Sequence, residues 1–342
     1  MRKRSFLCLP SLVLAAFPLC DPRSAFAWAP DGHRTVATIA DKLLQGTAAA
    51  NEVRKILGSV TLADAAVWAD CAKGVDPSTL EYKGAATHPE CASFETPAGK
   101  AAMVDFVKRN ATSCHPKPDE EICHKQYHYA DVSIQHPDYR PSYVGARDDD
   151  VVHAAAAAIA VLQGGTAPAP FSIKDRREAL LLLAHYAGDI HQPLHVGAVY
   201  LDGGGKIVNP DAGGFDPATE TRGGNRIVVK GSASNLHAIW DAVPAPLLAD
   251  SVNEAWLDAA KAIATTPGPV TGWPSAWAAD TQKQADKALA VLKFGPRSQA
   301  DQTWSTKLSS AYASSMTAVK RRQLTEAGAR LAQVLQKIWP AS

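Results

Sequence analysis

A carboxylate and three imidazoles lie in an otherwise apolar part of this chain, and they constrain its fold more than any other feature. The stretch Leu183-Ala-His-Tyr-Ala-Gly-Asp-Ile-His-Gln-Pro-Leu-His195 ends a long buried helix predicted over residues 174–190 and stopped by Pro193. His185 and Asp189 are four residues apart and therefore project from one face of that helix. Because an unpaired buried carboxylate is costly, a metal ion is the natural partner of Asp189.

A second pair with the same spacing strengthens the case for a metal. His237 and Asp241 also lie four residues apart, and His195 follows the proline break, where the chain can turn back toward a second metal. Imidazole and carboxylate groups are ligands that zinc accepts. One such pair is weak evidence, because an N-terminal or surface ion pair is the more common explanation, whereas two pairs favour metal binding. Asp70 and His128 are two further candidate ligands.

The N-terminal segment predicts a secretory signal peptide over residues 1–27. It consists of the basic Met1-Arg-Lys-Arg4, an apolar run over residues 6–20 and the small-x-small stretch Ala25-Phe-Ala27. Cleavage there leaves Trp28 as the first residue. Its free amine and carbonyl oxygen can chelate a metal in a five-membered ring, with His33 as a third ligand. The alternative is that Trp28 merely follows a cleavage site.

The mature chain is expected to run from residue 28 to residue 342 as a single zinc-binding domain of 315 residues, secreted or periplasmic. No later segment is long and apolar enough to span a membrane. The mature chain carries 31 basic and 33 acidic residues, a net charge of −2. Since this charge provides no general basic field, neutralisation of duplex phosphates by basic side chains is excluded as the means of handling nucleic acid.

Four cysteines follow the predicted signal peptide, and their even number in an exported chain favours two disulfides. The economical pairings are Cys71–Cys91 and Cys114–Cys123, although three pairings are possible. A zinc site made of all four cysteines is the alternative, but no Cys-x-x-Cys spacing supports it.

Helical spacing of apolar residues dominates the rest of the chain. Residues 72–126 predict loops held by disulfides, with one short helix, and the Gly-rich stretch 202–224 with Ile227–Val229 predicts a loop and a short β-hairpin. The fold class is therefore all-α, one mainly helical domain with long loops. The predicted helices cover residues 31–44, with Asp31 as the N-cap, and about 49–57, 62–70, 101–109, 154–163, 174–190, 235–241, 252–265, 274–292 and 320–338.

These motifs, taken in order, resemble those of the zinc-dependent single-strand nucleases, the S-one/P-one nuclease family, whose fold is shared by the bacterial zinc phospholipases C. The resemblance extends from Trp28 to the C-terminal helix. It includes Trp-Ala-Asp70, His128-Tyr-Ala-Asp131, Trp277-Ala-Ala-Asp280 and Ala327-Gly-Ala-Arg-Leu-Ala332. The segments between Asp70 and His128 and between Val196 and Arg226 look long for the fungal members, which affects the expected substrate preference but not the metal site.

The resemblance implies three zinc ions per chain. Asp70, His128, His185 and Asp189 would bind the first ion; Trp28, His33 and again Asp189 the second; and His195, His237 and Asp241 the third. Asp189 would then bridge two ions.

The resemblance also implies roles for three residues that are not ligands. Asp131 would orient or deprotonate the attacking water, although a cap or salt bridge is its ordinary structural explanation. Tyr129 would stack on an unpaired nucleobase, with a core tyrosine as the alternative. Asn225, in Gly223-Gly-Asn225, would support the site or contact substrate. His191 is expected to be structural or to support the ligands indirectly, since the expected ligands are already assigned.

The implied activity is hydrolysis of single-stranded DNA and RNA to 5′-phosphorylated products, together with 3′-nucleotidase activity, by a monomeric zinc endonuclease. Zinc phospholipase C is the first alternative. The last ligand in those enzymes looks like Glu in a His-x3-Glu motif, whereas this chain has Asp241, which favours the nuclease. A non-enzymatic zinc-binding module is the second alternative. Closed structural zinc sites have four protein ligands, whereas two of these three sites have fewer contributing residues, which argues against this alternative.

Overall fold

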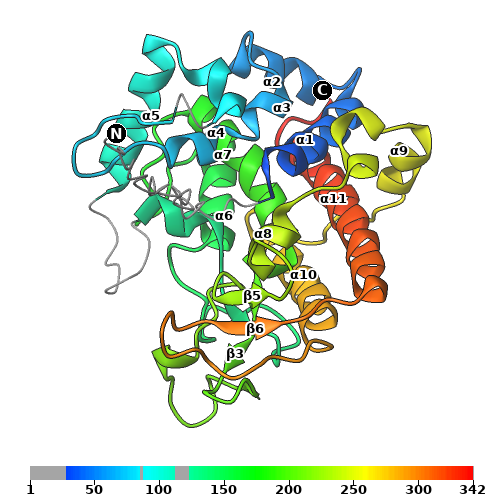
Figure 1. Cartoon of the computed structure of the whole chain (residues 1–342). Coiled ribbons are helices and arrows are strands. Elements are labelled where there is room, and N and C mark those ends of the chain that lie inside the picture. Colours follow the sequence, from blue (N-terminus) through cyan, green and yellow to red (C-terminus); the bar gives the residue numbers. More distant parts are fainter. Residues whose placement is uncertain (1–27, 85–87, 112–122, 342) are drawn as a thin grey trace, which may run out of the picture.

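The computed structural model describes residues 28–84, 88–111 and 123–341 (Figure 1). The predicted signal peptide, residues 1–27, lies outside the described residues. Helices form most of the molecule, and the short strands β3, β5 and β6 gather at its lower end in Figure 1. Within the described ranges, no helix has the length and apolar character needed to cross a bilayer. The predicted mainly helical fold is confirmed.

The longer helices follow the predicted order along the chain. Their bounds are α1 Pro30–Leu44, α2 Ala48–Leu57, α3 Leu62–Ala65, α4 Trp68–Ala72, α5 Pro97–Asn110, α6 Val151–Leu162, α7 Arg176–Asp189, α8 Leu236–Asp241, α9 Glu254–Lys261, α10 Trp273–Leu289 and α11 Ser310–Ile338. Short 3-10 helices join them: η1 Pro89–Phe94, η2 Cys123–His128, η3 Pro193–His195, η4 Pro217–Thr219, η5 Ala245–Leu247, η6 Ala249–Ser251 and η7 Val270–Gly272.

Helix α7 is the centre of the helical body. All its residues from Glu178 to Asp189 are buried, which explains why apolar residues occupy every face of it rather than one stripe. The helix begins at the N-cap Asp175, whose side chain accepts a hydrogen bond from the Glu178 N–H at 2.8 Å. Helices α1, α6 and α11 pack around it. The two candidate ligands on α7 therefore lie on a helix that is buried in the centre of the helical body.

Two details of the predicted helices are wrong. The N-cap of α1 is Ala29 rather than Asp31, because Pro30 lacks an N–H and has a fixed φ, which suits the first position of a helix. The helix predicted over residues 62–70 is two short helices, α3 and α4. Thr61 caps α3, and α4 starts at Trp68 after a break at residues 66–67.

Three short strand pairs are present among the described residues; two of them connect distant segments, and one of these brings candidate ligands together. In the parallel pair of β1 (Val132–Ser133) and β2 (Gly197–Ala198), Val132 lies opposite Gly197, so the chain after His128 lies beside the chain after His195. The antiparallel pair of β3 (Tyr200–Leu201) and β4 (Ile207–Val208) forms a short hairpin at the start of the stretch that was predicted to be a loop. The third pair is β5 (Ile227–Val229) with β6 (Trp304–Thr306).

The expected place of Ile227–Val229 in a local hairpin is therefore wrong. This strand pairs in parallel with Trp304–Thr306, which lies far along the chain. A parallel partner needs a long crossover connection, so nothing in the local sequence identifies it. The pair packs in a second apolar cluster with Trp240 and Leu289, which supports α8.

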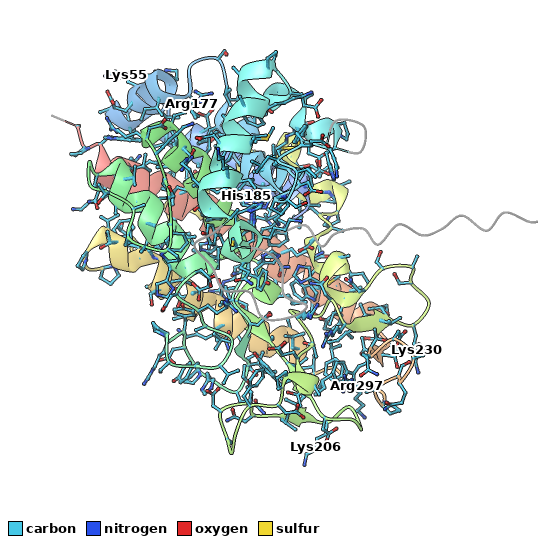
Figure 2. The ribbon with its side chains drawn as sticks, turned by 90° about the vertical axis from the view of Figure 1, so that its left-hand side faces the viewer. Lys55, Arg177, His185, Lys206, Lys230 and Arg297 are labelled. Atoms are coloured by element: carbon cyan, nitrogen blue, oxygen red, sulfur yellow. A yellow bond between two sulfur atoms is a disulfide. The ribbon has the colours of Figure 1, made fainter. Side chains whose placement is uncertain are left out.

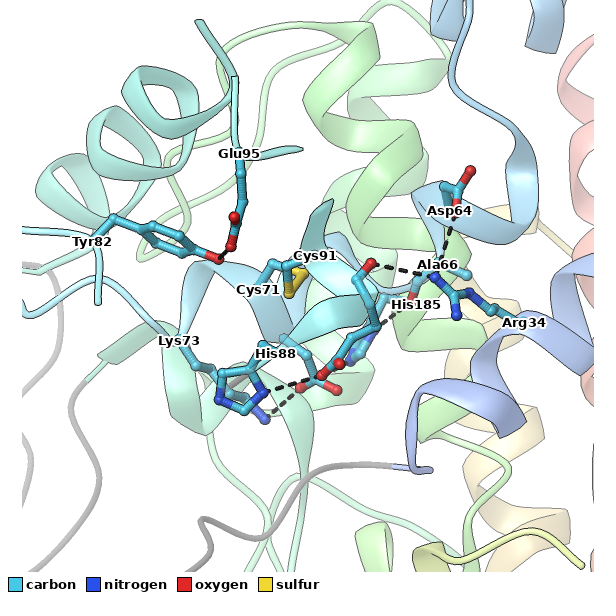
Figure 3. The surroundings of a disulfide bond; sticks show 12 residues. Arg34, Asp64, Ala66, Cys71, Lys73, Tyr82, His88, Cys91, Glu95 and His185 are labelled. Atoms are coloured by element: carbon cyan, nitrogen blue, oxygen red, sulfur yellow. Dashed lines mark hydrogen bonds and ion pairs between the residues drawn. A yellow bond between two sulfur atoms is a disulfide. The ribbon is translucent and has the colours of Figure 1, made fainter. Parts of the chain in front are cut away.

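One of the two expected disulfides is confirmed among the described residues. Cys71 and Cys91 are bonded, with their Cα atoms 5.7 Å apart, and they tie α4 to η1. The second expected pairing, Cys114–Cys123, involves Cys114, which lies outside the described residues. The confirmed bond lies close to the helix that carries His185, as Figure 3 shows.

Candidate metal centre

The nine candidate ligands come from six elements and from the segment before α1, and the structure brings them together. Figure 2 shows His185 near the middle of the molecule, between the end marked by Lys55 and the end marked by Lys206. All nine residues are buried: Trp28 before α1, His33 on α1, Asp70 on α4, His128 at the end of η2, His185 and Asp189 on α7, His195 at the end of η3, and His237 and Asp241 on α8.

Four of these side chains form the first cluster. The Nδ1 of His128 lies 3.0 Å from the Nε2 of His185, and the Oδ2 of Asp189 lies 3.1 Å from each of these nitrogens. The Oδ1 of Asp70 lies 3.7 Å from both nitrogens. Ligands about 2.0–2.2 Å from a tetrahedral zinc are separated by roughly 3.3–3.6 Å from one another. The four donor atoms therefore have about the spacing that one zinc ion requires.

Asp189 also belongs to a second group of donors. Its Oδ2 faces the first cluster, whereas its Oδ1 lies 3.4 Å from the Nε2 of His33. The His33 ring stacks on the His185 ring, with centroids 3.8 Å apart. Trp28 is fully buried at the start of the same helix. One carboxylate thus presents its two oxygens to two different sets of donors.

The third cluster is built around Asp241. Its Oδ1 lies 3.6 Å from the Nε2 of His195, and its Oδ2 lies 3.4 Å from the Nε2 of His237. The side-chain amide of Gln192 donates a hydrogen bond to the same Oδ1 at 2.7 Å. The N–H of Ala29 donates to the Asp241 carbonyl at 3.0 Å, which ties the segment before α1 to this cluster.

Backbone carbonyls orient three of the histidine rings. The Nδ1 of His185 lies 2.6 Å from the carbonyl oxygen of Ala66, a contact drawn in Figure 3. The Nδ1 of His195 lies 2.7 Å from the His128 carbonyl, and the Nδ1 of His237 lies 2.8 Å from the Gly223 carbonyl. Because a carbonyl only accepts, each Nδ1 carries the proton and each Nε2 presents its lone pair to a cluster. Metal-binding histidines are usually held in this way.

Several buried atoms that could bind a metal have no hydrogen-bond partner among the described residues. They are Nε2 of His33, Oδ2 of Asp70, Oδ1 of Asp189, Nε2 of His195 and Oδ2 of Asp241. A buried polar atom left without a partner costs about 1–3 kcal/mol, and more if it is charged. Bound divalent cations would satisfy these atoms, and the mixture of imidazole and carboxylate donors fits zinc.

Burial is the largest influence on the charge of the histidines. It lowers the pKa of His33, His128 and His237 and so favours the neutral ring that binds metals. Burial acts in the same direction on His185, but the charges of Asp189 and Asp70 outweigh it and raise its pKa. Burial opposes ionisation of Asp189, yet the neighbouring His185 and His128 outweigh it and lower the pKa of that carboxyl. The protein thus keeps the carboxylate charged in a fully buried place.

The clusters open on a cavity of about 420 Å³. Its lining includes His128, His195 and His237, together with all three residues that the sequence singled out as non-ligands: Tyr129, Asp131 and Asn225. Asp131 is held by its backbone, because its N–H donates to the Gly145 carbonyl at 3.0 Å and its own carbonyl accepts from the Tyr200 hydroxyl at 2.7 Å. Its carboxylate Oδ1 is buried.

The chain matches the family model described as S1/P1 Nuclease over residues 28–340, which is nearly its whole length. It belongs to the S1/P1 nuclease family. Two curated relatives come from Arabidopsis thaliana. Endonuclease 5 is 29% identical over 180 residues, which are 48% of this chain and 52% of the relative. Endonuclease 1 is 23% identical over 235 residues, which are 67% of this chain and 58% of the relative. The matched regions thus span little more than half of these relatives.

In this S1/P1 family member, Asn225 contacts its own loop. Its amide donates to the Arg222 carbonyl at 3.0 Å, and its Oδ1 accepts from the Asn235 side chain at 3.3 Å. Asn235 is the N-cap of α8, and the turn between Arg222 and Asn225 contains Gly223, whose carbonyl orients His237. Asn225 is thus part of the turn that orients His237, and it also lines the cavity, so both roles predicted for it stay predictions.

His191 has the structural role expected of it. It is buried between α7 and α11, where its Nδ1 contacts the Ala187 carbonyl at 2.7 Å and its Nε2 contacts Arg330 at 3.0 Å. Arg330 also donates to Asp280 at 2.6 Å. The two C-terminal stretches that resemble the family thus meet at this histidine and hold α7 in place.

Several residues that line the site have no sequence pattern that predicts their position there. Lys73, Arg147, Phe215 and Arg222 line the cavity, and the Nζ of Lys73 lies 2.8 Å from the Oδ1 of Asp70. Charged and aromatic side chains in loops are common, so only the fold reveals them. Gly188, in contrast, could have been noticed in the sequence. A glycine inside a long helix costs about 1 kcal/mol of stability relative to alanine, so its presence indicates that another group packs closely against the helix there.

Gly188→Ala is expected to remove one zinc ion per chain while leaving α7 intact. A Cβ at this position would lie 2.7 Å from the Nδ1 of His33, so the imidazole has to move away from Asp189. Elemental analysis of the purified, zinc-saturated protein measures the loss. Gly272→Ala is the control, since nothing lies within 4 Å of its Cβ position. Full zinc content in Gly188→Ala would contradict the required placement of His33.

Proposed function

We propose that this protein is a zinc-dependent nuclease that hydrolyses single-stranded DNA and RNA to 5′-phosphorylated products and also acts as a 3′-nucleotidase. The observation that carries the proposal is the shared carboxylate of Asp189, whose two oxygens face two different donor sets. A third cluster around Asp241 and a cavity with aromatic side chains adjoin them. Membership of the S1/P1 nuclease family supports the same activity.

The proposed ligands comprise the donors of all three clusters. Asp70, His128, His185 and Asp189 would hold one ion; the Trp28 amine and carbonyl, His33 and Asp189 a second; and His195, His237 and Asp241 a third. Bound zinc supplies Lewis-acid neutralisation of phosphate charge and acidifies water at neutral pH. This local positive charge takes the place of a basic surface.

The residues of the chain itself would position the substrate and move a proton. Asp131 lines the cavity beside His195, and its carboxylate would accept a proton from the attacking water. Tyr129, next to His128 in the same cavity, would stack on a nucleobase. Stacking on an aromatic ring requires an unpaired base, which accounts for a preference for single strands, and it tolerates any sequence.

The proposed second site also requires export and processing. Only removal of residues 1–27 frees the Trp28 amine to act as a ligand, and Trp28 is buried directly before the helix that carries His33. We therefore place the working enzyme outside the cytoplasm, in the secreted or periplasmic space, where the Cys71–Cys91 disulfide is also stable.

The test is release of 5′-phosphorylated nucleotides from a single-stranded oligonucleotide by zinc-loaded protein beginning at Trp28. We expect strong release, abolished by a chelator and restored by zinc. The matched control carries one Met before Trp28, and we expect it to bind one zinc ion fewer and to lose most activity. Full activity of the control would contradict the role of the amine. No release by fully zinc-loaded protein would overturn the nuclease assignment, and release of headgroups from phospholipid vesicles would then identify the phospholipase alternative.

A further inference from the structure

The long loop after His195 brings an aromatic residue to the cavity. We propose that Phe215 is a substrate-binding residue that contacts a nucleobase beside the cleaved phosphate, and that Asp211 and His136 position it. This inference rests on the proposed nuclease function and specifies how the substrate is held. It concerns residues outside the metal clusters: Phe215 and Asp211 in the segment between Val196 and Arg226, and His136 in an earlier segment.

The Asp211 carboxylate joins this loop to a distant segment. Its Oδ2 lies 2.7 Å from the Nε2 of His136, and its Oδ1 accepts a hydrogen bond from the N–H of Val144 at 3.0 Å. The His136 ring stacks on the Tyr143 ring, with centroids 3.6 Å apart and planes 7° apart. The side chains of His136 and Asp211 are only 14% and 24% exposed. We call the contacts of Asp211 with His136 and Val144 the clasp.

The clasp connects two segments that line the cavity. Residues 144–147 line it from one segment, and Phe215, Glu220 and Arg222 line it from the loop after His195. Because the N–H of Val144 donates to Asp211, a carboxylate of the loop is bonded directly to the first lining residue of the other segment. The clasp therefore fixes the loop relative to that segment.

Phe215 follows the clasp closely along the chain. Ala212, Gly213 and Gly214 separate it from Asp211. The two glycines have positive φ angles of 94° and 106°, and nothing lies within 4 Å of their Cβ positions. They have no side chains to pack, and glycine loses the most conformational freedom on ordering. We therefore expect loss of the clasp to displace Phe215, which also contacts the Tyr200 ring.

The aromatic side chains of Phe215 and Tyr200 can bind a flat ring next to a phosphate. Phe215 meets Tyr200 edge to face, with centroids 6.1 Å apart and planes 82° apart. The Tyr200 hydroxyl donates to the backbone carbonyl of Asp131 at 2.7 Å. The ring pair of Phe215 and Tyr200 is thus connected to the backbone of Asp131, the proposed general base. A nucleobase, which supplies both apolar area and an aromatic face, is the part of a nucleic acid that such a ring pair binds.

The experiment compares two substrates that differ only in their bases. The first is the dinucleotide of two thymidines, and the second is the same phosphodiester with both bases replaced by hydrogen. We expect Phe215→Ala and Asp211→Ala to raise KM for the first substrate roughly tenfold, with kcat within about twofold, and to leave the second unchanged. Phe215→Tyr, which keeps the ring, should retain the normal KM.

Two further variants separate positioning from general damage. Asp202→Ala removes a carboxylate from the same loop that only caps a local turn through Gly204 and Lys206, and it should behave as the unmodified protein. The double variant Asp211→Ala/Phe215→Ala should raise KM no more than Phe215→Ala alone, because both changes remove one contact.

The outcomes distinguish this inference from the proposed function. Equal losses on both substrates, or a normal KM in Phe215→Ala, would overturn the contact with a base. A normal KM in Asp211→Ala would overturn the positioning role of the clasp. If the unmodified, zinc-loaded protein cleaves neither dinucleotide, the nuclease assignment fails and this inference fails with it.

Discussion

Replacing Asp189 by asparagine is expected to remove two zinc ions per chain and to lower kcat/KM by roughly 10³-fold or more. The carboxylate is fully buried, and its two oxygens face different donors, with His33 on one side and His128 and His185 on the other. An amide nitrogen cannot ligate zinc, and the substitution also removes the negative charge that both ions share. Zinc content and kcat/KM on a single-stranded oligonucleotide, measured on the same preparation, test this directly.

His237→Ala is the matched control for this prediction. His237 lies 3.4 Å from Asp241 in the third cluster, and no described contact links it to Asp189. Its loss should therefore cost about one zinc ion and leave the pair around Asp189 occupied. Equal zinc loss in the two variants would contradict the shared role of Asp189, even if both lose activity.

The helices that carry ligands could be predicted because their sequences contain local information. Apolar spacing predicts α7 and α8, and in both helices the His-x3-Asp spacing places two ligands on one face. The predicted α11 starts at residue 320, whereas the helix begins at Ser310. Its first turns carry the apolar residues Tyr312, Met316 and Val319 at i, i+4 and i+7, which pack in the second apolar cluster, so the start of this helix was predictable from the spacing but was missed.

Contacts between distant segments could not be predicted from the sequence. The parallel pairs of β1 with β2 and of β5 with β6 depend on how helices pack between them, and strands of two or three residues carry almost no pattern. The first of these pairs sets the relation between His128 and His195. The sequence thus identifies the candidate metal ligands, but not how the chain brings them together.

The groups that orient the candidate ligands could not be predicted from the sequence, for a different reason. The carbonyls of Ala66, His128 and Gly223 hold three ligand rings, and every residue of a chain has such a carbonyl. Gln192, which donates to Asp241, lies between two ligands but has no spacing that indicates its role. The roles of the nine ligands themselves remain predictions, supported by the distances between their donor atoms.

The carboxyl of Asp131 is expected to determine how activity depends on pH. Burial raises its pKa to about 7, and Glu220 adds to this effect, while His195 and Arg222 act against it. A base works only when deprotonated, so activity should fall as the pH decreases below this pKa. The charge of bound zinc lowers the pKa, which places the fall at or below about pH 7. Zinc content measured at each pH separates this effect from the release of metal by protonated histidines.

Asp131→Asn is expected to lower kcat by roughly 10²–10⁴-fold while zinc content stays normal. Its folded-state pKa lies above the usual carboxyl value, so the folded protein binds the proton more tightly and stability falls as the pH rises through the interval between the two values. Above about pH 7 the charged carboxylate therefore destabilises the metal-free fold, and asparagine removes that cost. Thermal unfolding of the metal-free variant at pH 8 should accordingly show a midpoint no lower than that of the unmodified protein. A variant that keeps more than about a tenth of the activity, or loses zinc in proportion to activity, would show that Asp131 is not the base.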